Sequence, residues 1–241
     1  MRTDLLTHRQ KWDGFWRGVA TTERAAIWDV DPDVDIASGL PLDTGVFDPA
    51  LPLIDLGCGN GRQTAYFAGW FDFVVGIDIS AEAIRGAREI HEAPNVEYCV
   101  LDAGAVDQAF CLHEELGDAN VHVHELFHQL PAGHRDAVAA SVAELAGERG
   151  RVLVVEAGPG SAEVFEQLLI FDGPPPPKMA RVFDHGIRPG ELDDGEVVHL
   201  FAGHGFRLLR SGSLSLGSTV QLSDGAPFTV PGEFWLFGRD A

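Results

Sequence analysis

The run from Asp55 to Gly61 has the residue types and spacing needed to hold a nucleotide-like ligand. It reads Asp-Leu-Gly-Cys-Gly-Asn-Gly. Because glycine lacks a Cβ, a backbone of alternate glycines can approach a ligand closely. An apolar stretch, Leu51 to Ile54, precedes the run, and a helix-forming stretch, Arg62 to Ala68, follows it. The sequence therefore predicts a strand, a tight turn and a helix whose N-terminus points at the ligand.

The glycine spacing separates two classes of ligand. In the dinucleotide fingerprint G-x-G-x-x-G the third glycine comes three positions after the second. Here the interval is two, and Arg62 stands where that fingerprint requires glycine. With Asp55 two positions before the first glycine, the run resembles the first motif of class I S-adenosylmethionine (SAM)-dependent methyltransferases. A glycine turn that only closes an ordinary βα unit is the alternative.

The resemblance implies which residues contact SAM. Asp55 and the glycine turn would hold the methionine portion, and Asp78 would accept hydrogen bonds from the ribose hydroxyls. Asp102 would accept from the adenine amino group. On sequence alone, Asp78 as a helix cap and Asp102 as a loop residue remain alternatives. The expected cofactor residues are Asp55, Gly57, Cys58, Gly59, Gly61, Asp78, Ile79, Asp102, Ala103, His124 and Trp16.

The segment from His124 to His128 matches the zinc motif H-E-x-x-H. That motif binds zinc when one helix carries both imidazoles. Here Val121 to Val123 reads as a strand and Pro131 opens a new helix, so little helix is left, and we expect no metal site. The resemblance implies instead a turn after the fourth strand, in which His128 faces the methyl group and the substrate. A base is needed only if the nucleophile stays protonated, and His128 is then the candidate, with Glu125 and His124 behind it. A structural histidine bonded to a backbone carbonyl is the alternative.

Short apolar segments alternate with helix-forming segments along the middle of the chain, which indicates a doubly wound parallel sheet of the α/β class. The predicted strands are 51–54, 73–78, 96–101, 121–123, 151–156, 206–209 and 233–237, and the predicted helices are 7–19, 62–68, 81–91, 106–116, 132–147, 161–171 and 191–202. The resemblance implies a Rossmann-like, seven-stranded sheet whose last strand lies antiparallel beside the fifth.

The predicted domain organisation is a single SAM-binding domain with two additions. Residues 1–50 are expected to form an N-terminal helical extension or cap, with a connecting loop over 29–52. Residues 51–241 are expected to form the SAM-binding domain, with an insertion at about 158–190 as a substrate lid. The insertion includes a stiff proline-rich segment, Gly173 to Pro177. Its candidate pocket-wall residues are Phe165, Phe171, Met179, Phe183 and His185, with core packing as the alternative for each of them taken singly.

Composition excludes several kinds of partner. The chain of 241 residues carries 17 Lys and Arg against 37 Asp and Glu, a net charge of −20, which disfavours binding to nucleic acid. No apolar run is long enough for a membrane span, and the three cysteines indicate reduced thiols in a cytoplasmic protein. A small-molecule substrate and a monomer or homodimer are expected.

The predicted activity is in-line transfer of a methyl group from SAM to an O, N, S or C atom of a small metabolite. Alignment of nucleophile, methyl carbon and sulfur is the main requirement of such a reaction. The alternative is a methyltransferase-fold protein that binds SAM or S-adenosylhomocysteine (SAH) but acts as a natural-product cyclase or as a non-catalytic binding protein.

Overall fold

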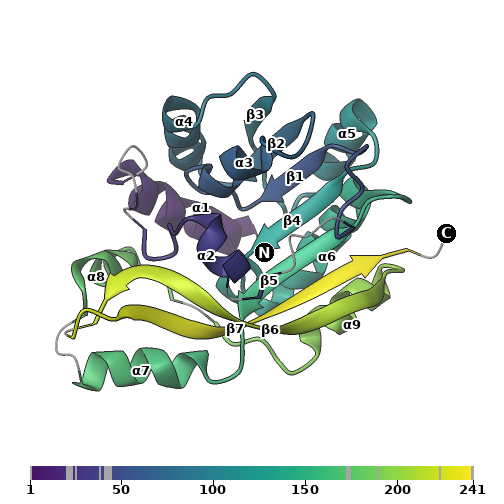
Figure 1. Ribbon diagram of the computed structural model, residues 1–241. Helices are drawn as coiled ribbons and strands as arrows, with labels where there is room; N and C mark the ends of the chain where they lie inside the picture. Colours follow the sequence, from purple (N-terminus) through teal and green to yellow (C-terminus); the bar gives the residue numbers. More distant parts are fainter. Residues whose placement is uncertain are drawn as a thin grey trace.

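The computed structural model describes residues 2–19, 24, 26–37, 39–40, 45–171, 175–188, 190–222 and 224–239. This part of the chain forms one seven-stranded sheet of order β3-β2-β1-β4-β5-β7-β6 (Figure 1). The strands are β1 (Leu53–Leu56), β2 (Val74–Asp78), β3 (Val96–Val100), β4 (Asn120–His124), β5 (Val152–Ala157), β6 (Arg207–Gln221) and β7 (Pro227–Gly238).

The first five strands are parallel, and β7 lies antiparallel to β5. The predicted fold class is thus confirmed, including the antiparallel last strand beside the fifth. The strand order reverses direction between β1 and β4, the point where open α/β sheets bind ligands at the strands' carboxyl ends. Asp55 on β1 stands opposite His122 on β4 in the register, so polar groups face each other across this point.

Helices cover both faces of the sheet. The helices are α1 (Arg2–Arg17), α2 (Pro32–Ala37), α3 (Arg62–Phe67), α4 (Ala81–Ile90), α5 (Val106–Leu116), α6 (Ala132–Ala146), α7 (Ser161–Phe171), α8 (Pro177–Asp184) and α9 (Glu196–Gly203), with a 3₁₀ turn η1 (Phe127–Gln129). One core cluster joins α5, α6 and α9 to the face that carries Val121, Val123 and Val154. A second cluster, around Phe67 and Leu153, fills the opposite face beneath α3.

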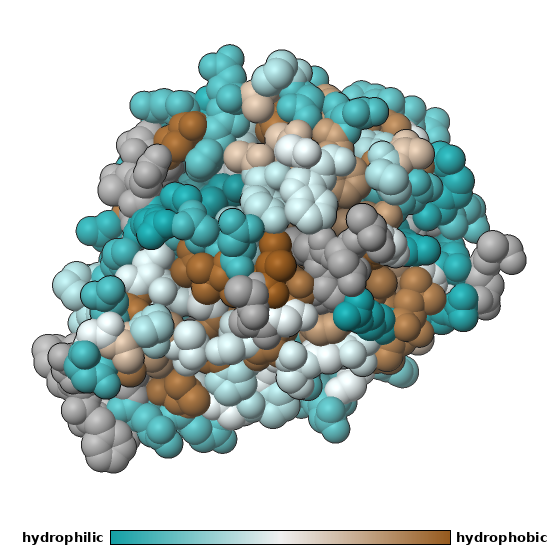
Figure 2. All heavy atoms as spheres, in the orientation of Figure 1, coloured by the Kyte–Doolittle hydropathy of each residue, from teal (hydrophilic) through white to brown (hydrophobic). Residues whose placement is uncertain are grey.

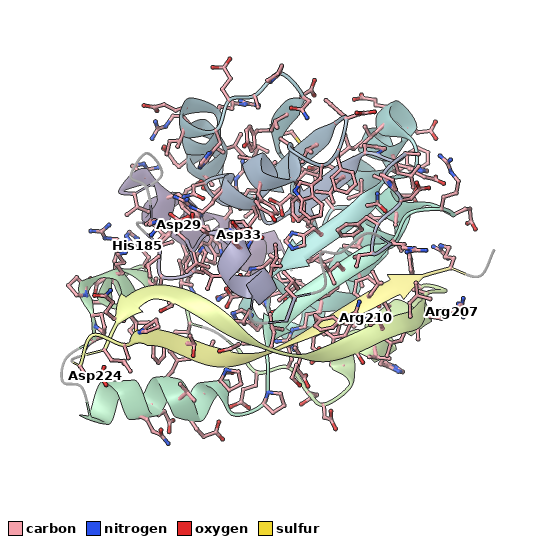
Figure 3. All side chains as sticks on the ribbon, viewed as in Figure 1. Asp29, Asp33, His185, Arg207, Arg210 and Asp224 are labelled. Carbon is pink, nitrogen blue, oxygen red and sulfur yellow. The ribbon has the colours of Figure 1, made fainter. Side chains whose placement is uncertain are left out.

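The C-terminal hairpin is much longer than predicted. β6 and β7 form a curved antiparallel ribbon in place of two short strands with a long connection (Figure 1). The predicted strands 206–209 and 233–237 left a connection that contains Gly217, Gly225, Pro227 and Pro231, residues typical of loops. However, Gly217 and Pro231 lie within the ladder, where register shifts next to Leu208 and Gly217 bend it. Figure 3 shows Arg207 and Arg210 near one end of the ribbon and Asp224 at its turn.

The ribbon packs against the N-terminal segment and the insertion. Figure 2 shows hydrophobic residues in the middle of this side of the molecule and hydrophilic residues over most of its upper part. Within the insertion, α7 matches its prediction, whereas α8 was not predicted. Pro177 occupies the first turn of α8, a position where its fixed φ favours a helix. Of the predicted proline-rich segment, Gly173 and Pro174 lie outside the described residues.

The N-terminal segment lies over the carboxyl ends of the strands. The Asp13 carboxylate accepts a hydrogen bond of 2.7 Å from the Ser80 hydroxyl, and Ser80 itself caps α4. Arg17 on α1 forms an ion pair of 3.1 Å with Glu82 on α4. α1 is therefore anchored to the N-terminus of α4. α2 interrupts the loop predicted over 29–52. In the described part of the chain, every helix is too short or too polar to span a bilayer.

Candidate active site

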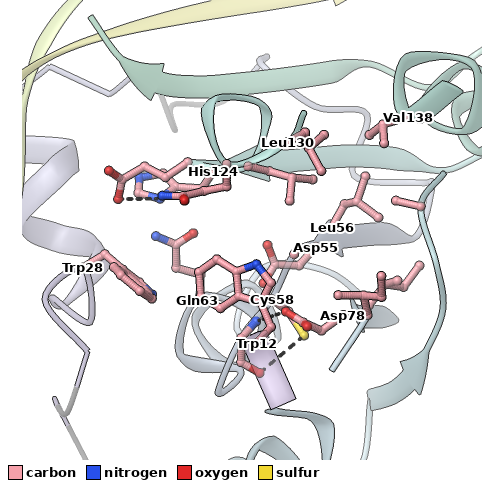
Figure 4. A pocket seen from close by; sticks show the side chains of 18 of the residues that line it. Trp12, Trp28, Asp55, Leu56, Cys58, Gln63, Asp78, His124, Leu130 and Val138 are labelled. Carbon is pink, nitrogen blue, oxygen red and sulfur yellow. Dashed lines mark hydrogen bonds and ion pairs between the residues drawn. The ribbon is translucent and has the colours of Figure 1, made fainter. Parts of the chain in front are cut away.

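A cavity of about 1240 Å³, including its open mouth, lies at the carboxyl ends of β1 to β4 (Figure 4). All of the predicted cofactor residues except Gly61 line it. We call it the main cavity. The sheet places these residues together because β1, β2 and β3 end side by side, each followed by a polar turn.

The glycine turn needs glycine at positions that only glycine adopts readily. Gly57 and Gly59 have φ of 80° and 55°, in the left-handed region. The amides of Gly57 and Cys58 both donate to the Ile77 carbonyl, which ties the turn to β2. A Cβ on Gly59 would stand 2.7 Å from the Trp16 ring. Because Gly57 and Gly59 have no side chains, the space along this wall of the cavity stays unfilled.

Gly61 was predicted to contact the cofactor, but the structure does not bring it to the cavity. It begins α3 with φ of 82°, and a Cβ there would stand 2.6 Å from the Tyr98 hydroxyl oxygen. The third glycine is thus required for close packing between α3, α4 and β3. Spacing alone does not distinguish this packing requirement from ligand contact.

Asp78 is buried at the end of β2 and faces the cavity. Its Oδ2 accepts from the Gly59 amide at 3.0 Å, and its Oδ1 accepts from the Ser80 amide at 2.8 Å. Burial raises the pKa of Asp78 to about 6, against the opposing effect of these two amides. The helix cap, which was the alternative role for Asp78, belongs to Ser80. Asp78 instead connects the glycine turn to the start of α4.

Asp55 is buried between β1 and β4. Its Oδ1 accepts from His122 Nδ1 at 2.9 Å, and its Oδ2 accepts from the Thr64 hydroxyl at 2.6 Å. Burial lowers the pKa of His122 even though Asp55 opposes that effect. A neutral imidazole therefore holds the carboxylate in place while Asp55 still lines the cavity.

Ile79, Asp102 and Ala103 line the opposite end of the main cavity. Asp102 accepts a hydrogen bond of 2.9 Å from the Gly104 amide, which closes the turn after β3. Ile79 is half-buried and presents an apolar surface to the cavity. The turns after β2 and β3 thus add an apolar side chain and a carboxylate to the cavity wall.

Aromatic residues from the N-terminal segment form the outer wall of the cavity. Trp12 and Trp16, four residues apart on α1, both line it together with Trp28. Each of the three rings lies within 6.4 Å of another member of the cluster or of Phe15. Sequence reasoning proposed Trp16 but missed Trp28, because Trp28 lies in a loop without a periodic pattern.

His124 at the end of β4 lies in a buried cluster of charges. Its Nε2 is 3.4 Å from Asp35 Oδ2, and its Nδ1 is 3.8 Å from Glu125 Oε2. Although burial opposes protonation, Asp35, Glu125 and Glu156 raise the pKa of His124 to about 9. His124 is therefore charged at neutral pH. Glu125, which also lines the cavity, has φ of 53°, a strained value for a residue with a side chain. No sequence pattern linked Asp35 to this cluster.

His128 lies apart from the other predicted residues. It is 5% exposed and lines a second cavity, which adjoins the main one. Its Nδ1 is 2.5 Å from Glu156 Oε2, and its Nε2 is 2.7 Å from the Gln129 amide nitrogen. Burial opposes protonation, but Glu156 and Glu125 outweigh it and raise the pKa of His128. Its ring is bonded to a carboxylate rather than to the backbone carbonyl of the alternative interpretation.

The H-E-x-x-H segment does not lie on one helix. His124 ends β4, whereas His128 belongs to η1, so the two imidazoles are on different elements. Among the described residues, His, Cys, Asp and Glu form no group of three suited to a metal ion.

Two of the candidate pocket-wall residues follow the alternative interpretation, core packing. Met179 is buried in the core beneath the hairpin, and Phe165 packs on Phe228. Neither they nor Phe183 and His185 line either of the two cavities. The side chain of Phe171 lies outside the described residues. An amphipathic insertion that covers the hairpin buries its apolar side chains there.

Comparison with known proteins identifies the family. A model of methyltransferase domains matches residues 53–150. The structure of a SAM-dependent methyltransferase from Anabaena variabilis ATCC 29413 is 32% identical, covers 95% of this chain and 94% of that chain, and superposes with a TM-score of 0.88. The chain belongs to the SAM-dependent methyltransferases. The cofactor of this family is SAM. A comparison with curated proteins found no significant match.

More distant structures share the fold. The magnesium protoporphyrin IX methyltransferase of Synechocystis PCC 6803, solved with bound SAH, is 19% identical, with coverage of 87% of this chain and 83% of that chain and a TM-score of 0.55. A structure described for the conversion of a disulfide bond into a thioacetal group during echinomycin biosynthesis is 18% identical, with coverage of 100% and 93% and a TM-score of 0.66.

The residues of the main cavity fit SAM. The backbone at Gly57 and Gly59 leaves room that a side chain would fill. The carboxylates of Asp55 and Asp78 suit an ammonium group and hydroxyl groups, and the aromatic wall suits a sulfonium cation or a flat ring. The fit therefore rests on the donor set and the shape of this chain's own cavity.

Proposed function

We propose that this protein binds SAM in the main cavity and transfers its methyl group to a small metabolite. When bound, SAM supplies an electrophilic methyl carbon on a sulfonium group that is a good leaving group. The observation that supports the proposal most strongly is the convergence of the glycine turn, Asp55, Asp78 and Asp102 on one cavity. Because three tryptophans line the outer side of this cavity, a ligand in it is partly shielded from water.

Each residue has a proposed task. Asp55, held by His122, faces the ammonium group of the methionine portion, and the glycine turn supports that portion. Asp78 accepts hydrogen bonds from the ribose hydroxyls, with Asp102, Ala103 and Ile79 at the adenine ring. His124 and Trp16 border the cofactor. The positively charged His124 is paired with the neighbouring carboxylates. These ion pairs fix the end of β4, where the reacting groups meet.

His128 is the proposed base for acceptors that are protonated before transfer. Glu156 accepts a hydrogen bond from the Nδ1–H group of His128. This bond orients the ring and leaves Nε2 as the proton acceptor. The Gln129 side chain lies on the same nitrogen and can donate to it or, turned over, accept from it. Glu156 also accepts from the amides of Leu126 and Phe127. It is thus a positioning residue for the whole turn.

The test is incubation of the protein with methyl-labelled SAM and fractions of a small-metabolite extract. We expect SAM to bind in calorimetry, SAH to form, and the label to appear in a small molecule. SAM binding without SAH formation in any fraction would favour the alternative, a binding protein or cyclase.

The same assay tests the base. His128→Gln should keep its affinity for SAM but turn over about 10²–10⁴ times more slowly. In the wild type, turnover should rise with pH through the raised pKa of His128, because the neutral form is the base. Glu156→Gln should move this rise to lower pH, a change that a purely structural role for Glu156 does not produce. A His128→Gln protein with unchanged turnover would remove His128 as the base.

A further inference from the structure

The second cavity, of about 720 Å³ with its open mouth, shares walls with the main cavity. His8 and Trp12 on α1, together with Gln129 and Leu130 after β4, line both. A molecule in the second cavity is therefore separated from a molecule in the main cavity only by these side chains. His128 lines the second cavity but not the main cavity.

The two cavities have opposite electrostatic character. Carboxylates line the main cavity, namely those of Asp29, Asp55, Asp78, Asp102 and Glu125. The described wall of the second cavity contains no Asp or Glu, and it includes Lys11 and Arg188. In a chain with 17 Lys and Arg against 37 Asp and Glu, this is an unusual concentration of positive charge.

These two cations are exposed, and each lies against a neighbouring part of the chain rather than against a carboxylate. A Cβ on Gly186 would stand 3.5 Å from Lys11 Cε and 3.9 Å from its Nζ, so the lysine side chain runs along this glycine. The Arg188 guanidinium lies 4.2 Å from the centroid of the Phe183 ring. Within the described parts of the chain, neither forms an ion pair with a carboxylate. Arg62, by contrast, is paired with Asp29 and Asp31.

We propose that the second cavity binds the methyl acceptor through a carboxylate, so that the acceptors are small organic acids. The inference rests on the proposed function, since that function makes the occupant a methyl acceptor. Lys11 and Arg188 bind the carboxylate, and the nucleophilic atom lies toward His128 and the wall shared with the main cavity. Because the protein as a whole is strongly negative, an anion gains access to this region only through such a local pair of cations.

Binding to the SAH-saturated protein tests this proposal without knowledge of the acceptor. The probes are 4-hydroxybenzoate, indole-3-acetate and hexanoate, each compared with its neutral amide by calorimetry in a phosphate-free buffer. We expect at least one acid to bind, about tenfold or more tightly than its amide, as for a charge-assisted hydrogen bond. Raising the salt concentration should weaken binding of the acid but not binding of the amide.

Matched variants distinguish the two cations from general surface charge. The double variant with Lys11→Gln and Arg188→Gln should bind the acid at least tenfold more weakly than the wild type does. Its affinity for SAH should be unchanged. Arg85→Gln, an exposed change on α4, should alter neither. The proposal is overturned if no acid binds, if acid and amide bind equally, or if the double variant binds the acid as the wild type does. Failure of the proposed function shows separately, either as failure of the wild type to bind SAH in the preceding titration or as SAM binding without SAH formation in the labelling assay.

Discussion

Asp78 is the residue whose protonation state most directly affects the proposed cofactor site. Because burial raises its pKa to about 6, Asp78 gains a proton in mildly acidic solution. A protonated carboxyl group is a poorer acceptor for ribose hydroxyls and for the Gly59 amide. We therefore expect SAM affinity, measured by calorimetry, to fall as the pH is lowered through about 6.

Two variants check this prediction. Asp78→Asn keeps the size of the side chain, and it should bind SAM roughly tenfold more weakly at neutral pH and show little change with pH. Asp72→Asn, an exposed change just before β2, is the control and should behave as the wild type does. If Asp78→Asn and the wild type follow the same pH curve, the ribose assignment is wrong.

At this scale the sequence was informative where function follows a local pattern. Asp55, Gly59 and Asp78 lie in a motif or at a strand end, and the structure brings them to one cavity. Their partners were missed. His122 was read only as part of a strand, because its contact with Asp55 joins two strands. Glu156, the partner of His128, was read only as the end of a strand, because its contact joins β5 to η1. Lys11 and Arg188 are likewise far apart in the chain and line one cavity only after folding.

Among the elements, α2 is attached in part through a buried ion pair. Asp35 is 1% exposed, pairs with His124 at 3.4 Å and accepts from the Gly217 amide at 3.1 Å. The folded-state pKa of His124, about 9, lies above its ordinary 6.5. The pair therefore contributes stability that is fully present below pH 6.5 and is lost as the pH rises through about 9.

We expect Asp35→Asn to lower the free energy of unfolding in urea by about 3–5 kcal/mol below that window, the usual loss when one partner of a buried pair is removed. The difference between variant and wild type should shrink at higher pH, as His124 loses its proton. Asp33→Asn, an exposed change on the same helix, should have little effect. A difference that stays constant across the window would contradict the ion pair as the cause.

Elements were predictable where one period dominates. Strands β1 to β5 and helices α4 to α7 agree closely with their predictions because apolar residues mark a buried face. β6 was predicted over 206–209 and extends to Gln221, since its ladder with β7 tolerates glycine and polar residues that face outward. α8 was missed because four consecutive prolines, 174–177, indicated an extended segment, whereas the last of them starts a helix.

Across the whole molecule, the net charge of −20 favours positively charged ligands. SAM carries one more positive charge than SAH, and the two are otherwise nearly the same shape. We therefore expect SAM affinity to fall more steeply than SAH affinity as the salt concentration rises, in calorimetry at a fixed pH. Equal slopes would show that the acidic main cavity and the surface charge make no contribution to donor binding.

The position of α1 has a consequence for synthesis of the protein. Its tryptophans leave the ribosome first, yet the segments that complete the second cavity, at residues 186–190, follow roughly 10–30 s later at ordinary rates of translation. During that interval the second cavity is incomplete, whereas α4 and the strands β1 to β4, against which α1 lies, have been made by residue 124. A truncated chain that ends between residues 138 and 186 therefore contains every lining residue of the main cavity but lacks one wall of the second.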